Sequence, residues 1–263
     1  MLSDRLELLI SSCDKYSDLW DLQIYHLNKN WANRNMRSVI VTDTTSKKAY
    51  ENIQIFAAGN ELEMPQRIKK VLETVSTEYV FITLDDYFLI EEVDNQKIEN
   101  LLNAMDQYKL DYIRLFPIPE ERKVLDKGKK LYWINLDRNY AVNLYPGIWR
   151  KSFLEATVNS PLDAWKYEVS LTSVAKANNF RCAMSKENIF MFVDVIRKGK
   201  LLNKANKYLA SNGMKLEREL ISRKEEFKLN LMFWAKKYFP KKIQKLIKKV
   251  MSLFGMKFIS EGI

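Results

Sequence analysis

The sequence predicts an α/β fold, in which a mixed, mostly parallel sheet is flanked by helices and followed by a basic amphipathic helical extension. Over about the first 115 residues, short β-branched and aromatic runs alternate with amphipathic segments of helical spacing. At 263 residues, with 47% apolar and 29% charged residues, the chain is long enough for one globular domain and an appendage. The surplus of basic residues is confined to the last quarter of the chain.

The first half of the chain reads as a series of βαβ units. The run L-E-L-L-I-S-S at 6–12 begins the series as a strand, and Pro65 suits the first turn of a helix that carries Ile68, Val71 and Val75 at helical spacing. In chain order we expect strands at 6–12, 38–43, 53–56, 79–84 and 111–116, and helices at 19–30, from Pro65 to about 75, and at 97–108. The ligand crevice of such a sheet lies beyond the carboxyl ends of its strands.

The second half predicts antiparallel, aromatic strands around one helix. L-Y-W-I-N-L and Y-A-V-N-L-Y have strand composition, whereas S-P-L-D-A-W-K-Y-E begins with a helix cap. We expect strands at 131–136, 140–145, 180–184 and 189–196, a turn and helix start at 146–154, and a helix from about Asp163 to 179. R-K-G-K at 197–200 is expected to close the domain.

Positive charge separates the C-terminal extension from the rest of the chain. Residues 200–263 hold 16 Lys/Arg and 5 Glu, and residues 1–199 hold 27 basic and 28 acidic residues. The extension predicts two helices, 227–239 and 241–254, on either side of Pro240. Each has an apolar stripe, and the residues expected to meet a membrane are Trp234, Lys241, Lys242, Lys245, Lys248 and Lys249. A basic amphipathic helix with aromatic residues is typical of a segment that lies on an anionic membrane. The alternative is that the apolar faces pack back onto the domain.

Cysteine content and hydropathy indicate a cytoplasmic protein. Cys13 and Cys182 have neither metal-site spacing nor the number expected of a secreted disulfide framework. The start of the chain lacks the layout of a signal peptide, and no window reaches the ~18 apolar residues of a spanning helix. We therefore expect a peripheral location on the inner face of the cell membrane.

Acidic residues follow three of the expected strands. Asp14 comes after the first strand, Asp43 ends the second, and Asp85 and Asp86 end the run V-F-I-T-L. Because the carboxyl ends of parallel strands share one edge of a sheet, these acids are expected to converge. Carboxylate oxygens are the ligands preferred by Mg²⁺ and Mn²⁺, and such an ion bridges protein to nucleotide phosphates.

The segments L-L-I-S-S-C-D-K-Y, S-V-I-V-T-D and E-Y-V-F-I-T-L-D-D-Y-F-L together resemble nucleotide-sugar glycosyltransferases of the GT-A fold, which is Rossmann-like. The resemblance covers roughly residues 5–200 and is closest to bacterial enzymes that build capsule, O-antigen or other surface polysaccharide. It implies a catalytic domain at 1–200, with a nucleotide-sugar half at 1–116 and an acceptor half at 117–200, and an extension at 201–263.

The same resemblance implies roles for individual residues. Asp85 and Asp86 match the acidic motif that holds the metal ion and the donor diphosphate, and D-D-Y leaves open which of them binds the metal. The residues that match nucleotide-sugar contacts are Ser11, Ser12, Asp14, Asp43, Asp85 and Arg150. Asp43 equally suits a turn, and Arg150 equally suits a surface. Asp194 is a further candidate metal ligand, whereas His26, the single histidine, is expected to be structural.

The segment W-K-Y-E resembles the acceptor side, where an inverting enzyme keeps its general base. Glu168 and Asp163 are the two candidates. Asp163 stands where a helix cap belongs, whereas Trp165 and Tyr167 are expected to shield Glu168 and raise its pKa. Glu168 is therefore preferred as the group that takes the proton of the acceptor hydroxyl.

The resulting expectation is a Mn²⁺- or Mg²⁺-dependent inverting glycosyltransferase that uses a nucleotide sugar, a UDP-sugar above all. Its acceptor is expected to be a saccharide linked to polyprenyl diphosphate at the membrane. One alternative is a sugar nucleotidyltransferase, although the first loop lacks the Gly-rich phosphate motif of that class. Another is a non-catalytic protein whose lysines bind membrane or nucleic acid. No nucleic-acid partner is expected, because the main domain carries almost no net charge.

Overall fold

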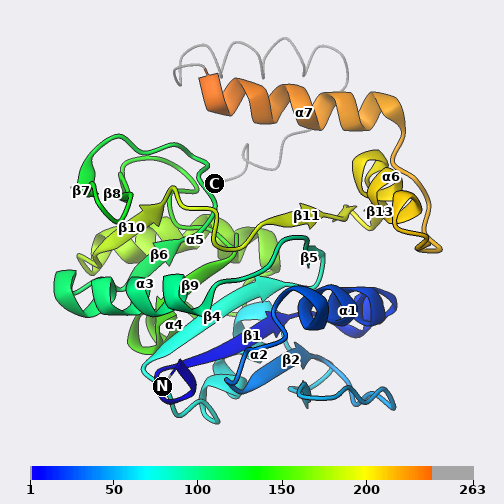
Figure 1. The fold of residues 1–263 in the computed structure, drawn as a ribbon, viewed down its shortest axis with the longest axis horizontal. Coiled ribbons are helices and arrows are strands. Elements are labelled where there is room, and N and C mark those ends of the chain that lie inside the picture. The colour runs from blue at the N-terminus through cyan, green and yellow to red at the C-terminus, as the bar shows by residue number, and fades with distance from the viewer. Residues whose placement is uncertain (1, 239–263) are drawn as a thin grey trace. The chain divides into compact units, whose positions relative to one another are not determined.

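The computed structural model describes residues 2–238, with the side chains of residues up to 231 (Figure 1). Two compact units make up the chain. The first unit comprises Met1–Pro117 and Glu121–Val195, and the second comprises Ile118–Glu120 and Ile196–Ile263. The boundary thus falls at 195/196, one residue before the R-K-G-K segment at 197–200 and five residues before the expected boundary at 200/201. The expected helix at 241–254 lies outside the described residues, as do Lys241, Lys242, Lys245, Lys248 and Lys249.

A nine-stranded mixed sheet forms the centre of the first unit, in the order β3-β2-β1-β4-β9-β6-β10-β8-β7. Its strands are β1 (Leu6–Ser11), β2 (Ser38–Thr42), β3 (Gln54–Ala57), β4 (Tyr79–Leu84), β6 (Tyr112–Arg114), β7 (Val124–Asp126), β8 (Leu131–Trp133), β9 (Gly147–Arg150) and β10 (Cys182–Ser185). Pairing is parallel from β3 through β4 and between β6 and β10, whereas β9 and β8 are antiparallel to their neighbours. The expected α/β fold with a mostly parallel sheet is confirmed.

Helices cover both faces of this sheet (Figure 1). Helices α1 (Trp20–Asn30) and α3 (Asn95–Tyr108) pack on one face, and α2 (Met64–Leu72), α4 (Lys151–Thr157) and α5 (Ala164–Ala177) pack on the other. Alternate residues of β1 separate the two cores, since Leu8 belongs to the first and Leu9 to the second. Every residue of β1 and β2 is buried, as expected of parallel strands covered on both faces.

The segment 140–145, expected to be a strand, instead forms turns. Tyr140 has a left-handed backbone (φ 58°), which interrupts an extended run. Side chains take up the backbone groups of this segment: Thr172 accepts from the N–H of Val142 at 3.1 Å, and Glu168 accepts from that of Leu144 at 3.2 Å. Strand β9 follows directly, where only a turn before a helix was expected, and the hairpin partner of β8 is β7.

Short elements complete the described chain. In the first unit, Asp14–Leu19 forms a 3-10 helix, and β5 (Tyr87–Leu89) pairs antiparallel with β11 (Phe192–Asp194). The second unit contains the β12 (Ile196–Arg197) and β13 (Lys200–Leu201) hairpin, α6 (Asn203–Ser211) and α7 (Arg223–Tyr238). Helix α7 covers the described part of the expected helix 227–239 and includes Trp234, whose side chain lies outside the described residues. Among the residues described, no helix is both long and apolar enough to span a bilayer.

Candidate functional site

Polar residues from three strand ends meet at the carboxyl edge of β1, β2 and β4. These strands are parallel neighbours, and Ser11 at the end of β1 pairs with Val41 of β2 and Leu84 of β4. Backbone hydrogen bonds continue this register, from Ser12 N to Val41 O at 2.9 Å and from Asp85 N to Ser11 O at 3.2 Å. The carboxyl-edge cluster comprises Ser11, Ser12, Asp14, Thr42, Asp43, Asp85 and Asp86. The expected convergence of acids is therefore present in the structure.

Asp43 is fixed in this cluster by several donors. Its Oδ1 accepts from the N–H of Asp14 at 2.6 Å and from the hydroxyl of Thr42 at 3.1 Å, and the same hydroxyl is 3.0 Å from Asp14 Oδ1. Burial alone would raise the pKa of Asp43, but these hydrogen bonds and the charge of Arg67 outweigh burial and lower it. Asp43 is therefore an ionised acceptor at neutral pH and does more than form a turn.

Asp85 is turned inward and held by Ser12 and Trp20. The Ser12 hydroxyl donates to Asp85 Oδ2, and Trp20 Nε1 donates to Ser12 Oγ at 2.7 Å. Only 7% of the Asp85 surface is exposed. Because one carboxylate oxygen is already used to anchor the first loop, Asp85 acts in the structure as a positioning residue for β1 and its loop.

Asp86 lies beside Asp194, which the β5–β11 pair brings from far along the chain. Asp194 pairs with Tyr87, and the N–H of Val195 donates to Asp86 O at 2.9 Å. The two acids are therefore one residue apart across paired backbones. Asp86 and Asp194 both interact with other residues of the protein. In each of them the Oδ1 atom is buried and accepts no hydrogen bond within the described chain.

The donor set at this edge consists of oxygen atoms. Within residues 2–238 no group of three or more His, Cys, Asp or Glu side chains forms a metal cage. Mg²⁺ and similar ions at nucleotide sites need fewer protein ligands, commonly one or two carboxylates together with substrate phosphates and water. Asp86 and Asp194, whose backbones are paired one residue apart, supply two carboxylates, which fits that requirement in number and in chemistry.

Glu168 lies on α5 at the same edge of the sheet. Its Oε1 accepts from Leu144 N, and that turn leads into β9, whose Gly147 pairs with Ile82 of β4 and with Arg114 at the end of β6. The expected aromatic shield is absent from the described contacts. Tyr167 points into the core with its hydroxyl 2.8 Å from that of Thr157, and Trp165 is 45% exposed.

Asp163 caps α5, and its pKa is lowered chiefly by the hydrogen bond that its Oδ1 accepts from Lys166 N at 2.9 Å. The capping interpretation of this residue is therefore sufficient for its position. Because the Asp163 carboxylate is hydrogen-bonded to the end of its own helix, it is also poorly placed to accept a proton from a substrate.

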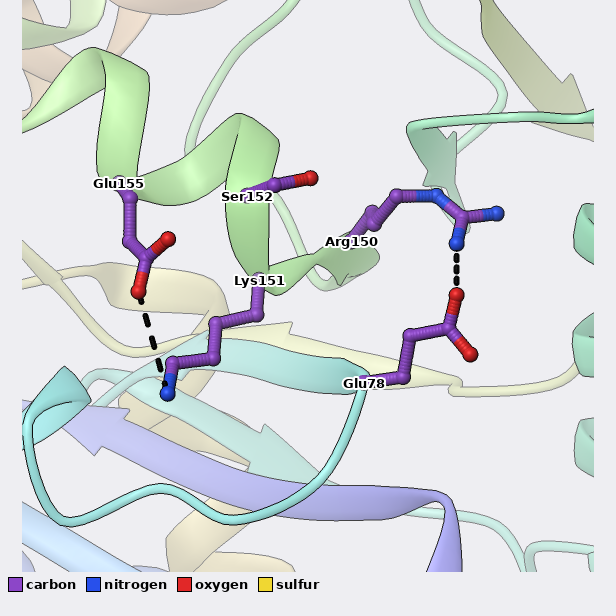
Figure 2. Close-up of a pocket in the computed structure, with 5 residues that line it drawn as sticks. All are labelled: Glu78, Arg150, Lys151, Ser152 and Glu155. Carbon is purple, nitrogen blue, oxygen red and sulfur yellow. Dashed lines mark hydrogen bonds and ion pairs between the residues drawn. The ribbon is translucent and has the colours of Figure 1, made fainter.

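Arg150 lies at the opposite edge of the sheet from Asp85. It pairs with Tyr79, the first residue of β4, whereas Asp85 follows the last residue of that strand. Six residues of extended chain span roughly 20 Å. In a pocket of about 350 Å³, Arg150 forms an ion pair with Glu78, and Lys151 lies 3.8 Å from Glu155 (Figure 2). The geometry corrects the expectation that Arg150 faces a diphosphate held by Asp85.

Sequence reasoning missed Arg67 and a group of aromatic side chains. The charge of Arg67, on α2, lowers the pKa of Asp43 and opposes the rise in that of Cys13, so the guanidinium lies near both. Its NH1 donates to Leu62 O at 2.5 Å, and its Nε is buried with no acceptor in the described chain. Nothing in the amphipathic pattern of that helix distinguishes this cation from its lysines.

The aromatic group surrounds Tyr87, next to Asp86. Ring centroids of Tyr87 and Phe192 are 4.4 Å apart, those of Phe116 and Tyr145 4.3 Å, and those of Tyr87 and Tyr145 5.9 Å. Tyr87 is buried and the other three are partly exposed. The single histidine is structural, as expected: His26 stacks on Phe88 and its Nδ1 is 2.7 Å from Leu22 O.

No family model and no curated protein matches the sequence. Among solved structures, S. aureus TarS 1–349 is similar at 13% identity with a TM-score of 0.48, over 71% of this chain and 59% of that one. The same protein in complex with UDP-GlcNAc aligns at 11% identity with a TM-score of 0.49, over 91% and 69%. A CMP:2-keto-3-deoxy-manno-octonic acid synthetase complexed with CTP aligns at 16% identity with a TM-score of 0.47, over 72% and 93%.

The chain thus spans about 59% of the TarS 1–349 structure.

Proposed function

We propose that this protein is a glycosyltransferase that binds a nucleotide sugar at the carboxyl-edge cluster. The observation that carries the proposal is the meeting of Ser12, Asp14, Asp43 and Asp86 at adjacent parallel strand ends. An ionised Asp43 suits the hydroxyl and N–H donors of a nucleoside, because it is acceptor-only. The nearby Arg67 adds a cation for the phosphates or the base.

The proposed metal site is formed by Asp86 and Asp194, and Asp85 serves it indirectly by fixing the loop after β1. Mn²⁺ or Mg²⁺ would supply charge neutralisation for the nucleoside diphosphate leaving group. Two carboxylates leave room in the coordination sphere for diphosphate oxygens. In this proposal Asp86, and not Asp85, is the metal ligand of the D-D-Y motif, because Asp85 already accepts from Ser12.

Glu168 is the proposed general base. During transfer the acceptor hydroxyl oxygen forms a bond to the anomeric carbon while the bond from that carbon to the diphosphate oxygen breaks. The hydroxyl proton passes to the Glu168 carboxylate, and the electron pair of the broken bond leaves with the diphosphate. Attack from the face opposite the leaving group inverts the anomeric configuration.

The acceptor is proposed to be a saccharide on polyprenyl diphosphate, at an anionic membrane surface on the cytoplasmic side. Nine lysines and no acid occur from Lys228 to Phe258. Basic residues next to an anionic bilayer contribute about 1 kcal/mol each at most, so several of them give reversible membrane attachment. The enzyme and its lipid-linked acceptor would then share one surface.

The proposal is tested by screening nucleotide sugars for binding and hydrolysis with and without Mn²⁺. A UDP-sugar is expected to raise the Tm of the wild-type chain only when the metal is present, because binding to the folded state stabilises it. Asp86→Asn and Asp194→Asn should abolish this rise. Asp137→Asn, which changes an exposed acid paired with Lys176, is the matched control and should retain it.

Two results would contradict the proposal. The first is the absence of any stabilising nucleotide sugar across a panel of nucleosides and sugars. The second is release of pyrophosphate from a nucleoside triphosphate and a sugar phosphate, which would assign the chain to the nucleotidyltransferase alternative.

A further inference from the structure

A second pocket lies at the β7–β8 side of the first unit. Its volume is about 520 Å³, within the range of small-ligand sites. The residues that line it include Glu121, Arg122, Lys123, Trp133, Leu136 and Arg138. None of them belongs to the carboxyl-edge cluster, and the proposed transfer reaction uses none of them.

Glu121 provides a buried acceptor in this pocket. The residue is 2% exposed, and its Oε2 is 3.8 Å from NH1 of Arg138. Its Oε1 atom is buried and accepts no hydrogen bond from any residue in the described chain. Burial raises the pKa of Glu121, and the charges of Arg138 and Arg114 and a hydrogen bond from the backbone N–H of Asn135 oppose that rise. A buried carboxylate with few donors is costly, so a ligand hydroxyl that reaches the Glu121 carboxylate from the pocket would stabilise the site.

Trp133 provides a flat apolar surface beside this acceptor. The guanidinium of Arg181 covers its ring at 5.0 Å from the centroid, and the side chain is only partly buried. An indole that is rigidly held and partly open suits the apolar face of a sugar ring. A hydroxyl acceptor next to an aromatic surface is a combination that favours carbohydrate over a purely apolar ligand.

The rim of the pocket is positively charged. Arg122 and Lys123 are exposed and form no ion pair with the described residues, and Arg138 adds a third cation to the one charge of Glu121. The local surplus favours a ligand that carries negative charge, such as a carboxylate or phosphate group.

The pocket adjoins the side of the proposed site where Glu168 lies. Arg114 is fully buried, its charge acts on both Glu121 and Tyr145, and its NH1 donates to Ala141 O at 2.6 Å. The same turn, 140–146, presents Leu144 N to Glu168. The turn 140–146 and the buried Arg114 guanidinium therefore connect the pocket around Glu121 with Glu168.

We infer that the Glu121–Trp133 pocket binds an anionic saccharide, as a subsite for a part of the acceptor chain distant from the reacting hydroxyl. Its role in catalysis rests on the proposed transferase function, whereas saccharide binding itself does not. Residues of this subsite touch the acceptor and not the reacting atoms, so they determine which acceptor is used.

The test uses the indole N–H signals of the full-length protein in two-dimensional NMR, because the chain has 6 Trp. Trp133→Phe identifies the reporter signal. The probes are tri-galacturonic acid as anionic saccharide, maltotriose as neutral saccharide, and inorganic phosphate. Tri-galacturonic acid should shift the Trp133 signal saturably, and maltotriose should bind about tenfold more weakly or less. UDP-sugar with Mn²⁺ is titrated into the same samples as an independent measure of the nucleotide site.

Three variants sharpen the test. Glu121→Gln keeps the shape of the side chain and should raise the Kd for tri-galacturonic acid about tenfold, equivalent to 1.4 kcal/mol. The double variant Arg122→Gln, Lys123→Gln alters only exposed residues and should also raise it, so the test survives if Glu121→Gln fails to fold. Trp165→Phe, on an exposed indole elsewhere, should leave the Kd unchanged.

The inference is overturned if neither oligosaccharide shifts the Trp133 signal, or if inorganic phosphate shifts it equally at the same concentration. An unchanged Kd in both the Glu121 and the rim variants would overturn it as well. If Trp133 responds but no UDP-sugar binds, the saccharide site stands and the proposed transferase function fails. If a UDP-sugar binds but the Trp133 signal does not respond, the saccharide site is rejected and the transferase proposal is unaffected.

Discussion

At the residue scale, the two adjacent acids that end V-F-I-T-L have different environments. Asp85 is buried and accepts a hydrogen bond from the Ser12 hydroxyl, whereas Asp86 directly precedes β5 and its backbone oxygen accepts from Val195 N, next to Asp194. Identical side chains one position apart therefore have different partners in the turn that follows β4.

This difference predicts that Asp85→Ala lowers stability and that Asp86→Ala abolishes metal-dependent nucleotide binding. Removing the Asp85 carboxylate leaves the buried Ser12 hydroxyl without its acceptor, which should lower the free energy of unfolding by about 1–3 kcal/mol. Asp86→Ala should change stability by less and abolish metal-dependent nucleotide binding. Urea denaturation measures the first effect and Mn²⁺ titration the second. Equal destabilisation by both variants would contradict the assignment.

Glu168 and Asp163 form a second pair of acids whose roles are separable. If Glu168 is the base, Glu168→Gln should lower the transfer rate about 10²- to 10⁴-fold with little change in donor affinity. Asp163→Ala should cost about 1 kcal/mol of stability through the lost cap and leave the rate nearly unchanged. Single-turnover kinetics with a radiolabelled donor checks both. A large rate loss in the Asp163 variant alone would reverse the assignment.

Cys13 offers a pH-dependent reporter within the proposed nucleotide site. Burial, and next the charges of Asp85 and Asp43, raise its pKa, so less thiolate is present at a given pH than in a free cysteine. Alkylation by iodoacetamide should therefore be slower than that of glutathione at about pH 7.5, and its rate should keep rising at higher pH. A bound UDP-sugar with Mn²⁺ should protect it further. Mass spectrometry distinguishes it from Cys182, which is 3% exposed. Labelling as fast as glutathione would refute this environment.

At the scale of elements, the parallel part of the sheet was predictable and the antiparallel part was not. Runs such as S-V-I-V-T and Y-V-F-I-T-L are continuous and β-branched because both faces are buried, and their positions matched closely. The segment from Tyr140 to Tyr145 is also mostly apolar and aromatic, but its backbone groups bind Arg114, Thr172 and Glu168. Such long-range partners leave no trace in a local pattern.

The candidate site was predictable to the same extent. Asp14, Asp43 and Asp85 are each the first acid after a recognisable strand, so their convergence followed from the parallel topology. The β5–β11 register that brings Asp194 to Asp86 depends on residues more than a hundred positions apart. Arg150 was misplaced because its strand, G-I-W-R, read as a turn, and an antiparallel strand carries its last residue to the opposite edge.

Strand β9 requires a residue without a side chain at Gly147. A Cβ there would come within 2.9 Å of Tyr112 Cε2 and 3.0 Å of the Ile113 carbonyl. Gly147→Ala should therefore lower stability by about 1–3 kcal/mol through overpacking. Gly128→Ala is the control, since its nearest contact would be an ordinary 3.5 Å to Asp126 Oδ1. Thermal unfolding of the two variants compares them, and equal Tm values would show that β6 and β9 pack less closely than these distances indicate.

At the scale of the whole molecule, positive charge is concentrated in the extension. The sheet-bearing part is nearly neutral and the extension strongly basic, so the proposed membrane attraction and the proposed nucleotide binding belong to different segments. Changes in one should leave the other intact.

The extension is tested by replacing Lys241, Lys242, Lys245, Lys248 and Lys249 with Gln. Flotation with vesicles that contain anionic lipid should fall about tenfold or more, and added salt should have the same effect on the wild type. UDP-sugar binding should not change. The matched control replaces five exposed lysines of the first unit: Lys47, Lys69, Lys127, Lys166 and Lys176. Equal losses in both variants would show attraction by total charge and not by the extension.

Strand β9 also determines whether the nucleotide half and the acceptor half can be separated. It comes from the proposed acceptor half, yet it is hydrogen-bonded between β4 and β6, which both come from the nucleotide half. A cut near residue 117 would therefore leave β4 and β6 without the strand that joins them. Fragments 1–116 and 117–195 should each fail to fold alone and should assemble only together, as one cooperative unit. The two proposed substrate-binding halves are regions of one sheet, so neither is a separate module.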